Sequence, residues 1–225
     1  MTSTLFNFPK QAYFGRVIPK TKFYEHAALT RKLKDLFVKQ VEQIVWLYKL
    51  APETINLPAT NSVPELQVFK VVLKGDELGD EILRCIDQSV MFPLLFEVES
   101  SDKVRLVAAY KRKSNSADGK WVLTDYYSTE WLAVDSQRVD LQYSLSLASI
   151  YEQVLKAISP IEPRNGEGLD ALFERNEQIK KKLNEFTRIE SKLKQEKQFN
   201  KKVELNASLR GIKIDIEQLS AQSVN

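Results

Sequence analysis

The stretch VEQIVWLYKL at residues 41–50 decides the fold class of this chain. Its β-branched and aromatic residues alternate with a period of two, which indicates a strand whose centre is buried on both faces. VPELQVFKVVLKG at 63–75 predicts a second strand. Further strands are expected in FPLLFEVE (92–99), KVRLVAAYKRK (103–113) and KWVLTDYYSTEWL (120–132). Short polar turns separate these last three, a spacing typical of an antiparallel meander.

Helical periodicity surrounds these strands. Apolar residues recur at helical spacing over 22–38, where Thr21 is the expected cap, and again over 77–90 and 141–158. The order helix, two strands, helix, three strands, helix predicts an α+β core domain over residues 21–160. Its sheet is expected to be mostly antiparallel, with helices flanking it. Residues 1–20 contain prolines among aromatic and basic residues, and we expect an extended aromatic/basic arm there.

The composition changes after a Pro- and Gly-containing linker at residues 161–168. Residues 169–225 show heptad spacing and predict a coiled-coil-like stalk, with a register break at 195–204. This break leaves two geometries open, one long helix or a helical hairpin. The apolar seam must be covered either by a partner or by the protein's own body. The seam residues, which form the expected partner interface, are Leu172, Ile179, Leu183, Phe186, Leu193, Leu205, Leu209, Ile212, Ile216 and Leu219.

The composition excludes several classes of protein. Among 225 residues there is one cysteine, Cys85, and one histidine, His26. A disulfide framework, a zinc cage of Cys and His, and a Ser-His or Cys-His catalytic apparatus therefore lack their parts, and we expect a reducing cytoplasm. No apolar run approaches the roughly 18 residues of a membrane span. No Gly-rich phosphate loop or dinucleotide fingerprint occurs, so we expect no cofactor.

Basic residues concentrate at the start of the chain. The overall net charge is +3, but residues 1–41 hold eight Lys or Arg against two acidic residues, a local net charge of +6. Clustered cations beside aromatic rings predict a nucleic-acid surface, whereas an ordinary solvated surface explains the same pattern. The candidate nucleic-acid-binding residues are Lys20, Lys22, Arg31, Lys32, Lys34, Lys111, Arg112, Lys113 and Trp121.

The remaining candidate catalytic residues are acidic residues on the predicted strands. Glu65, Gln67 and Lys70 resemble the acid, glutamine and lysine pattern of metal-dependent nucleases. The strand period of two places Lys70 on the opposite face from the other two, which weakens this interpretation. Glu97 and Glu99 share a strand face, and we expect Lys111 and Lys113 on the neighbouring strand. A ladder of cross-strand ion pairs explains this set as well as a catalytic site does.

Several phrases of the chain together resemble a known family. They are FPK (8–10), IPKTKFYEH (18–26), VEQIVWLYKLAPETINLPAT (41–60), VPELQVFKVVLK (63–74), AYKRK (109–113), STEWL (128–132) and EKQFNKKVELN (196–206). This set is similar to the bacterial family catalogued as domain of unknown function 4391. The resemblance implies a cytoplasmic bacterial protein encoded beside a DEAD/DEAH-type helicase and a site-specific DNA methyltransferase. That neighbourhood is typical of anti-phage defence and restriction–modification islands. The resemblance carries over no catalytic residue.

The expected function follows from the seam and the resemblance together. We expect a non-catalytic accessory or adaptor subunit of a bacterial anti-phage defence or restriction–modification-type assembly. Its protein partner would be a helicase, a methyltransferase or a second copy, reached through the C-terminal helices, and nucleic-acid contact would be optional. One alternative is a nucleic-acid-binding module that uses the basic N-terminal segment. The second alternative is a metal-dependent nuclease at Glu65, Gln67 and Lys70.

Overall fold

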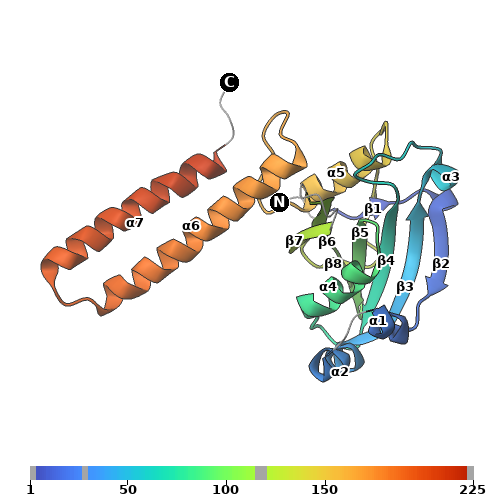
Figure 1. The fold of residues 1–225 in the computed structure, drawn as a ribbon, viewed down its shortest axis with the longest axis horizontal. Coiled ribbons are helices and arrows are strands. Elements are labelled where there is room, and N and C mark those ends of the chain that lie inside the picture. Colours follow the sequence, from blue (N-terminus) through green and yellow to red (C-terminus); the bar gives the residue numbers. More distant parts are fainter. Residues whose placement is uncertain (1–3, 27–29, 115–120, 222–225) are drawn as a thin grey trace. The chain divides into compact units, whose positions relative to one another are not determined.

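The computed structural model describes residues 4–26, 30–114 and 121–221. The chain divides into two compact units, 1–159 and 160–225. The helices and strands of both units are labelled in Figure 1. Among the described residues, no helix has the length and apolar character needed to cross a bilayer.

The first unit is built on a seven-stranded sheet. Six strands follow one another in space: β2 (Tyr13–Val17), β3 (Val41–Leu50), β4 (Leu66–Leu73), β5 (Leu94–Ser100), β6 (Lys103–Lys113) and β7 (Trp121–Ser128). The short strand β8 (Leu132–Ala133) pairs with β6. All neighbours are antiparallel except β4 and β5, which α4 (Asp80–Ser89) connects as a parallel pair. The predicted α+β class with a mostly antiparallel sheet is confirmed.

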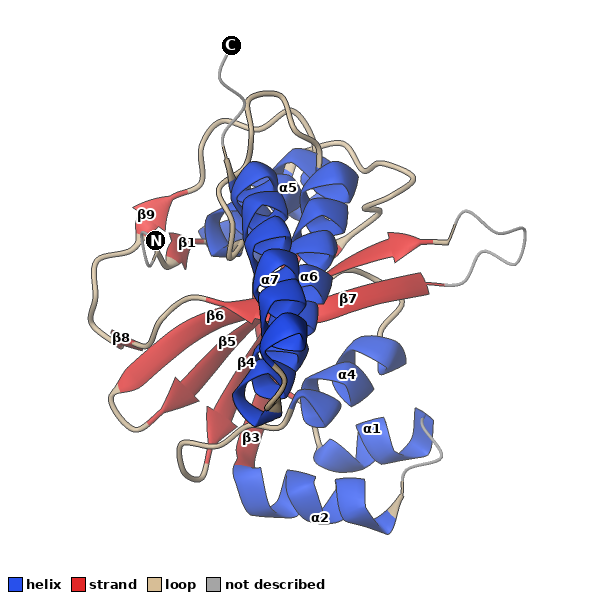
Figure 2. Cartoon of the chain, turned by 90° about the vertical axis from the view of Figure 1, so that its left-hand side faces the viewer, coloured by secondary structure: helices blue, strands red, loops and turns tan. Residues whose placement is uncertain are grey.

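Three helices cover one face of this sheet. Both α1 (Lys20–His26) and α2 (Arg31–Gln40) contact α4 (Figure 2). The core between the helices and the sheet contains the fully buried Phe37, Ile82 and Phe96. The sequence predicted one helix over 22–38, whereas the structure has two. The Thr30 hydroxyl caps the second by accepting a hydrogen bond of 3.3 Å from the Leu33 amide.

The fourth helix of the unit, α5 (Leu147–Ile158), packs against β6. This helix begins at Leu147, six residues after its predicted start at 141, and Ser146 caps it. Tyr151 links helix and strand because its hydroxyl donates to the Ala109 carbonyl and accepts from the Lys111 amide, both at 2.9 Å. These bonds lie at a register shift of β6, between Ala109 and Lys111, where regular ladder pairing is interrupted.

The start of the chain belongs to the first unit. β1 (Phe6–Asn7) pairs in parallel with β9 (Val139–Asp140) as a small separate sheet. A 3₁₀ turn, η1 (Lys10–Ala12), leads into β2, which is an edge strand of the main sheet. Gly15 has a φ of 63°, at the register shift between Tyr13 and Arg16. Residues 13–17 pair with β3 as part of the main sheet. The short helix α3 (Pro52–Ile55) lies between β3 and β4.

The second unit is a helical hairpin. α6 (Leu169–Gln195) runs against α7 (Phe199–Ser220), and the reversal occurs within the region where the heptad register breaks. Figure 1 shows the two helices side by side. At the turn, the Glu196 carboxylate accepts hydrogen bonds of 2.8 Å from the amides of Lys197 and Gln198. Of the two geometries that the sequence left open, the hairpin is the one found.

Candidate functional site

The predicted seam lies mostly within the hairpin. Of its ten residues, Leu172, Ile179 and Ile212 are buried, Leu183 is 49% exposed, and the other six are partly buried. Since α6 packs against α7, the hairpin covers much of its own apolar stripe.

Apolar side chains also remain on the outer face of α7. Phe199, Val203 and Ile214 are exposed, the last two to about half of their surface. The spacings of four and eleven residues place all three on one face of the helix. The seam residue Ile212, by contrast, is buried. The hairpin therefore presents apolar surface in addition to the seam that the sequence predicted.

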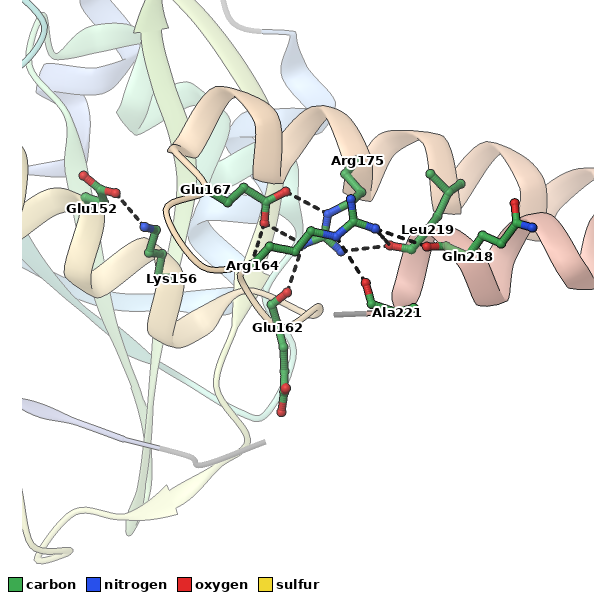
Figure 3. A network of polar contacts seen from close by, with 9 residues as sticks. All are labelled: Glu152, Lys156, Glu162, Arg164, Glu167, Arg175, Gln218, Leu219 and Ala221. Carbon is green, nitrogen blue, oxygen red and sulfur yellow. Dashed lines mark hydrogen bonds and ion pairs between the residues drawn. The ribbon is translucent and has the colours of Figure 1, made fainter. Parts of the chain in front are cut away.

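An ionic cluster ties the base of the hairpin together (Figure 3). Arg175 makes a bidentate pair with Glu167, at 2.8 Å from Nε and 2.6 Å from Nη2. The two side chains are only 6% and 8% exposed. The hydrogen bond from Arg175, helped by the Arg164 amide, lowers the pKa of Glu167 to about 2. We call Arg164, Glu167 and Arg175 the clasp.

The clasp also binds the end of α7. The Arg164 guanidinium donates to the carbonyls of Gln218, Leu219 and Ala221 at 3.1–3.2 Å. Arg175 Nη1 adds a hydrogen bond of 3.0 Å to the Leu219 carbonyl. These are carbonyls that a helix end leaves without intrahelical partners, and positive charge is favourable there. The clasp thus fixes the two ends of the hairpin to each other.

The basic residues of the N-terminal segment lie on α1 and α2. Lys22, Arg31, Lys32 and Lys34 are exposed. Lys20 is partly buried, and its ammonium donates to the Val41 carbonyl. Burial is the main reason why the pKa of Lys20 is lowered. Four of the five predicted cations are therefore exposed on neighbouring helices.

The second predicted basic group is only partly at the surface. Lys113 is exposed, and its ammonium lies 5.8 Å from the centroid of the Trp121 ring. Arg112 is partly buried. Lys111 is buried, and its ammonium donates to the carbonyls of Asp87 at 2.6 Å and Val90 at 2.5 Å. The prediction that Lys111 contacts nucleic acid is corrected, because the end of α4 covers its side chain.

Lys111 belongs instead to a buried polar network. Its ammonium lies 3.4 Å from Asp87 Oδ1, and the Tyr126 hydroxyl donates to Asp87 Oδ2 at 2.8 Å. Burial raises the pKa of Asp87 to about 6, although Lys111 and Tyr126 oppose the shift. Cys85 is buried on the same helix, and burial raises the pKa of its thiol, opposite to what a reactive cysteine needs. The side chain of His26 lies outside the described residues.

The residues of the nuclease pattern are separated. Gln67 donates a hydrogen bond to Glu65, and Lys49 Nζ lies 3.5 Å from the second oxygen of Glu65. Lys70 extends from the other face of β4 and pairs with Glu99 at 2.7 Å. Among the described residues, no three His, Cys, Asp or Glu side chains are grouped to hold a metal ion. The structure brings Glu65 and Gln67 together and places Lys70 elsewhere.

A hollow of about 800 Å³ lies beside Lys70. Its floor includes Lys70, Glu97 and Glu99, which alternate with core residues along β4 and β5 and so face away from α1, α2 and α4. Residues of β1 and β9 also line it. We call it the open-face hollow. Sequence reasoning did not find it, because its parts are separated by more than 130 residues.

The acidic residues of the floor have other partners than expected. Arg138 donates to both carboxylate oxygens of Glu97, at 2.6 and 3.0 Å, and Glu99 pairs with Lys70. The interpretation of these residues as a cross-strand ladder with Lys111 and Lys113 is therefore wrong. The side chain of Lys111 is engaged under α4, and residue 138 enters from a loop that no strand pattern indicates.

Comparison with known proteins gives a family. Residues 6–216 match the family described as "Domain of unknown function (DUF4391)". No curated protein and no solved structure matches the chain.

Proposed function

Because this chain belongs to the DUF4391 family and ends in a clasped helical hairpin, we propose that it is a non-catalytic adaptor. In this proposal the hairpin makes protein–protein contacts within a bacterial anti-phage defence or restriction–modification-type assembly. The observation that carries the proposal is the exposed apolar row on α7, namely Phe199, Val203 and Ile214.

The geometry of the hairpin supports a recognition role. Apolar residues at helical spacing on an exposed face are what a helix presents to a groove on another protein. The clasp fixes the helix ends before any partner arrives, so association would cost less conformational entropy. Leu183, half exposed on α6, adds apolar surface to the same unit.

The partner is proposed from the resemblance stated above. It would be the helicase or the methyltransferase encoded beside the gene, in a bacterial cytoplasm. Self-association through the same row is the competing arrangement, and it is distinguished by size in solution. A continuous coiled coil between two copies has less support, because α6 already packs against α7 in one chain.

The test uses a variant of the apolar row. Val203→Glu with Ile214→Glu places two charges on this row. Because both side chains reach solvent, we expect the double variant to fold. We expect the full-length protein to co-purify with the co-expressed helicase or methyltransferase, and the double variant to lose at least tenfold in recovered partner. Asn200→Glu, on the exposed start of the same helix, is the matched control.

The result is decisive in either direction. Equal recovery by the parent and the double variant would exclude the apolar row as the contact surface. A twofold higher mass of the parent alone in light scattering, absent in the variant, would assign the row to self-association instead.

A second candidate function has one specific observation in its favour. Lys22, Arg31, Lys32 and Lys34 are exposed on α1 and α2, so phosphate groups in solution can reach their side chains. If this surface binds DNA or RNA, log K falls linearly with log salt concentration, and replacing Lys32 and Lys34 by Ala lowers the slope by about two. A salt-independent affinity would remove this candidate.

A further inference from the structure

We infer that the open-face hollow binds a mononucleotide-sized ligand, namely an aromatic ring with hydroxyl groups and a single phosphate. This inference is independent of the proposed adaptor role, since all residues of the hollow belong to the first unit. Its volume of about 800 Å³ lies within the range of small-molecule pockets, roughly 300–1,000 Å³.

A held arginine is the first part of the site. Arg138 Nη1 donates to Glu97 and to the Phe6 carbonyl, at 2.6 and 3.0 Å, and Nη2 donates to the second Glu97 oxygen. These bonds use three of the five N–H groups of a guanidinium. Because the Glu97 side chain is only 4% exposed, water does not compete for its carboxylate, and the carboxylate orients Arg138. The remaining N–H groups are donors for an anion.

Two further donors lie at the hollow with different roles. Lys10 is exposed at the rim and forms no ion pair with any other described residue. Its flexible ammonium suits a phosphate, and no ion pair with another described residue would have to break for it to bind one. Tyr48, which lines the wall, adds a hydroxyl group.

The other side chains of the hollow suit a ring and hydroxyl groups. The Phe8 and Tyr48 rings lie 5.2 Å apart and tilted, so they form an aromatic wall. Asn7 Nδ2 donates to Asp140 Oδ1 at 2.9 Å, which fixes both side chains while one oxygen of each remains to accept hydrogen bonds. Carboxylate and amide oxygens beside an aromatic wall match the hydroxyls and ring edge of a nucleoside.

The charge of the lining limits the ligand to one phosphate. Three cations, Lys10, Lys70 and Arg138, face three carboxylates, and the formal sum is zero. The carboxylates of Glu99 and Asp140 would repel the successive phosphates of a polynucleotide. A single phosphate beside Lys10 and Arg138 avoids this repulsion.

The test is calorimetric titration of the full-length protein at 0.15 M salt. The probes are AMP, GMP, CMP and UMP, their four nucleosides, and inorganic phosphate. We expect at least one mononucleotide to bind with a Kd below about 1 mM and at least tenfold more tightly than its nucleoside or inorganic phosphate. Absence of heat for all four mononucleotides at 5 mM would overturn the inference, as would equal affinity for inorganic phosphate (~1 mM or tighter).

Variants locate the binding. Lys10→Ala removes the ammonium, and Tyr48→Phe removes only the hydroxyl while its ring keeps its contact with Phe8. Each variant should weaken mononucleotide binding about five- to tenfold. Lys39→Ala, an exposed lysine on α2, is the matched control and should leave the affinity unchanged. Unchanged affinity in both variants, or an equal loss in the control, would place the ligand outside the hollow.

Discussion

The two units of this protein each bury an ion pair, but the surroundings of the two pairs differ. In the sheet unit, Asp87 and Lys111 have 0% and 2% exposed side chains and lie beneath α4 beside a large apolar core. In the hairpin, Arg175 and Glu167 lie at an open end, where their other contacts are backbone carbonyls and a second arginine. The Asp87–Lys111 pair lies within an apolar core. The Arg175–Glu167 pair instead joins the ends of two helices by polar contacts.

The difference shows how each unit is stabilised. The sheet unit has apolar contacts from several helices, so its buried pair lies within a fold that apolar packing already holds together. The hairpin has few fully buried apolar residues, and polar contacts join residues 54–57 positions apart. All three tryptophans lie in the first unit, so fluorescence reports the sheet unit alone.

Removing the lysine of the sheet pair should have the largest effect. Lys111→Met leaves the Asp87 carboxylate buried without its cation, and we expect the free energy of unfolding to fall by about 3–5 kcal/mol. Urea unfolding followed by tryptophan fluorescence measures it. Lys103→Met, exposed at the start of the same strand, should change the value by less than about 0.5 kcal/mol. A Lys111 variant within about 1 kcal/mol of the parent would contradict the buried pair.

Breaking the clasp should have the next largest effect, confined to the hairpin. Arg175→Met leaves the Glu167 carboxylate and the Leu219 carbonyl without this donor, and we expect a loss of about 1–3 kcal/mol. Ellipticity at 222 nm should show an earlier helical transition, while tryptophan fluorescence stays at its parent midpoint. Arg188→Met, exposed on the same helix, serves as control. A simultaneous shift of both signals would mean that the two units unfold together.

The two pairs should also respond to pH with opposite signs. The pKa of Asp87 is raised from 3.8 to about 6, so the folded sheet unit holds the proton more tightly and loses stability as the pH rises from about 4 to 6. The pKa of Glu167 is lowered from 4.5 to about 2, so the hairpin loses stability as the pH falls from about 4.5 to 2.

Difference measurements isolate these two carboxyl groups. Unfolding at a series of pH values, recorded by fluorescence and by ellipticity, should show the first slope disappear in Asp87→Asn and the second in Glu167→Gln. If the free energy of unfolding changed with pH in the same direction in both units of the parent protein, the proposed difference between the two pairs would be wrong.

The smallest expected effect comes from a glycine in the hairpin. Gly211 lies within α7, and a Cβ atom added there would meet nothing within 4 Å. Gly211→Ala should therefore stabilise the hairpin by about 0.5–1 kcal/mol, measured by the helical transition. Gly166→Ala is the contrasting variant, because the φ of 71° at Gly166 strains any other residue and should lower stability. Destabilisation by Gly211→Ala would indicate that another group lies close to position 211.

Periodic elements could be predicted from the sequence. The strands at 41–50 and 103–113 have the predicted bounds, because alternating apolar residues specify a strand locally. The α+β class followed from their order. The edge strand β2 was not predicted as part of the sheet, since Gly15 and its register shift interrupt the alternation.

Contacts between distant residues could not be predicted in the same way. Arg138 meets Glu97 across 41 residues, and Arg164 reaches the end of α7 across more than 50. No periodicity encodes such pairings, so the open-face hollow and the clasp were missed. A weak signal existed for the clasp, because Arg175 lies between the seam residues Leu172 and Ile179 and is buried. The burial of Lys111 could not be predicted either, because the residues next to it in the sequence do not indicate that α4 covers its side chain.

The parallel pairing of β1 with β9 bears on the order of events during synthesis. Phe6 and Asn7 find their partners only at residues 139 and 140. At ribosomal rates of 5–20 residues per second, the amino-terminal strand waits roughly 7–27 s before its partner has been made. Throughout that interval the aromatic segment is open to chaperones, whereas α6 and α7, adjacent in the chain, can meet as soon as they emerge.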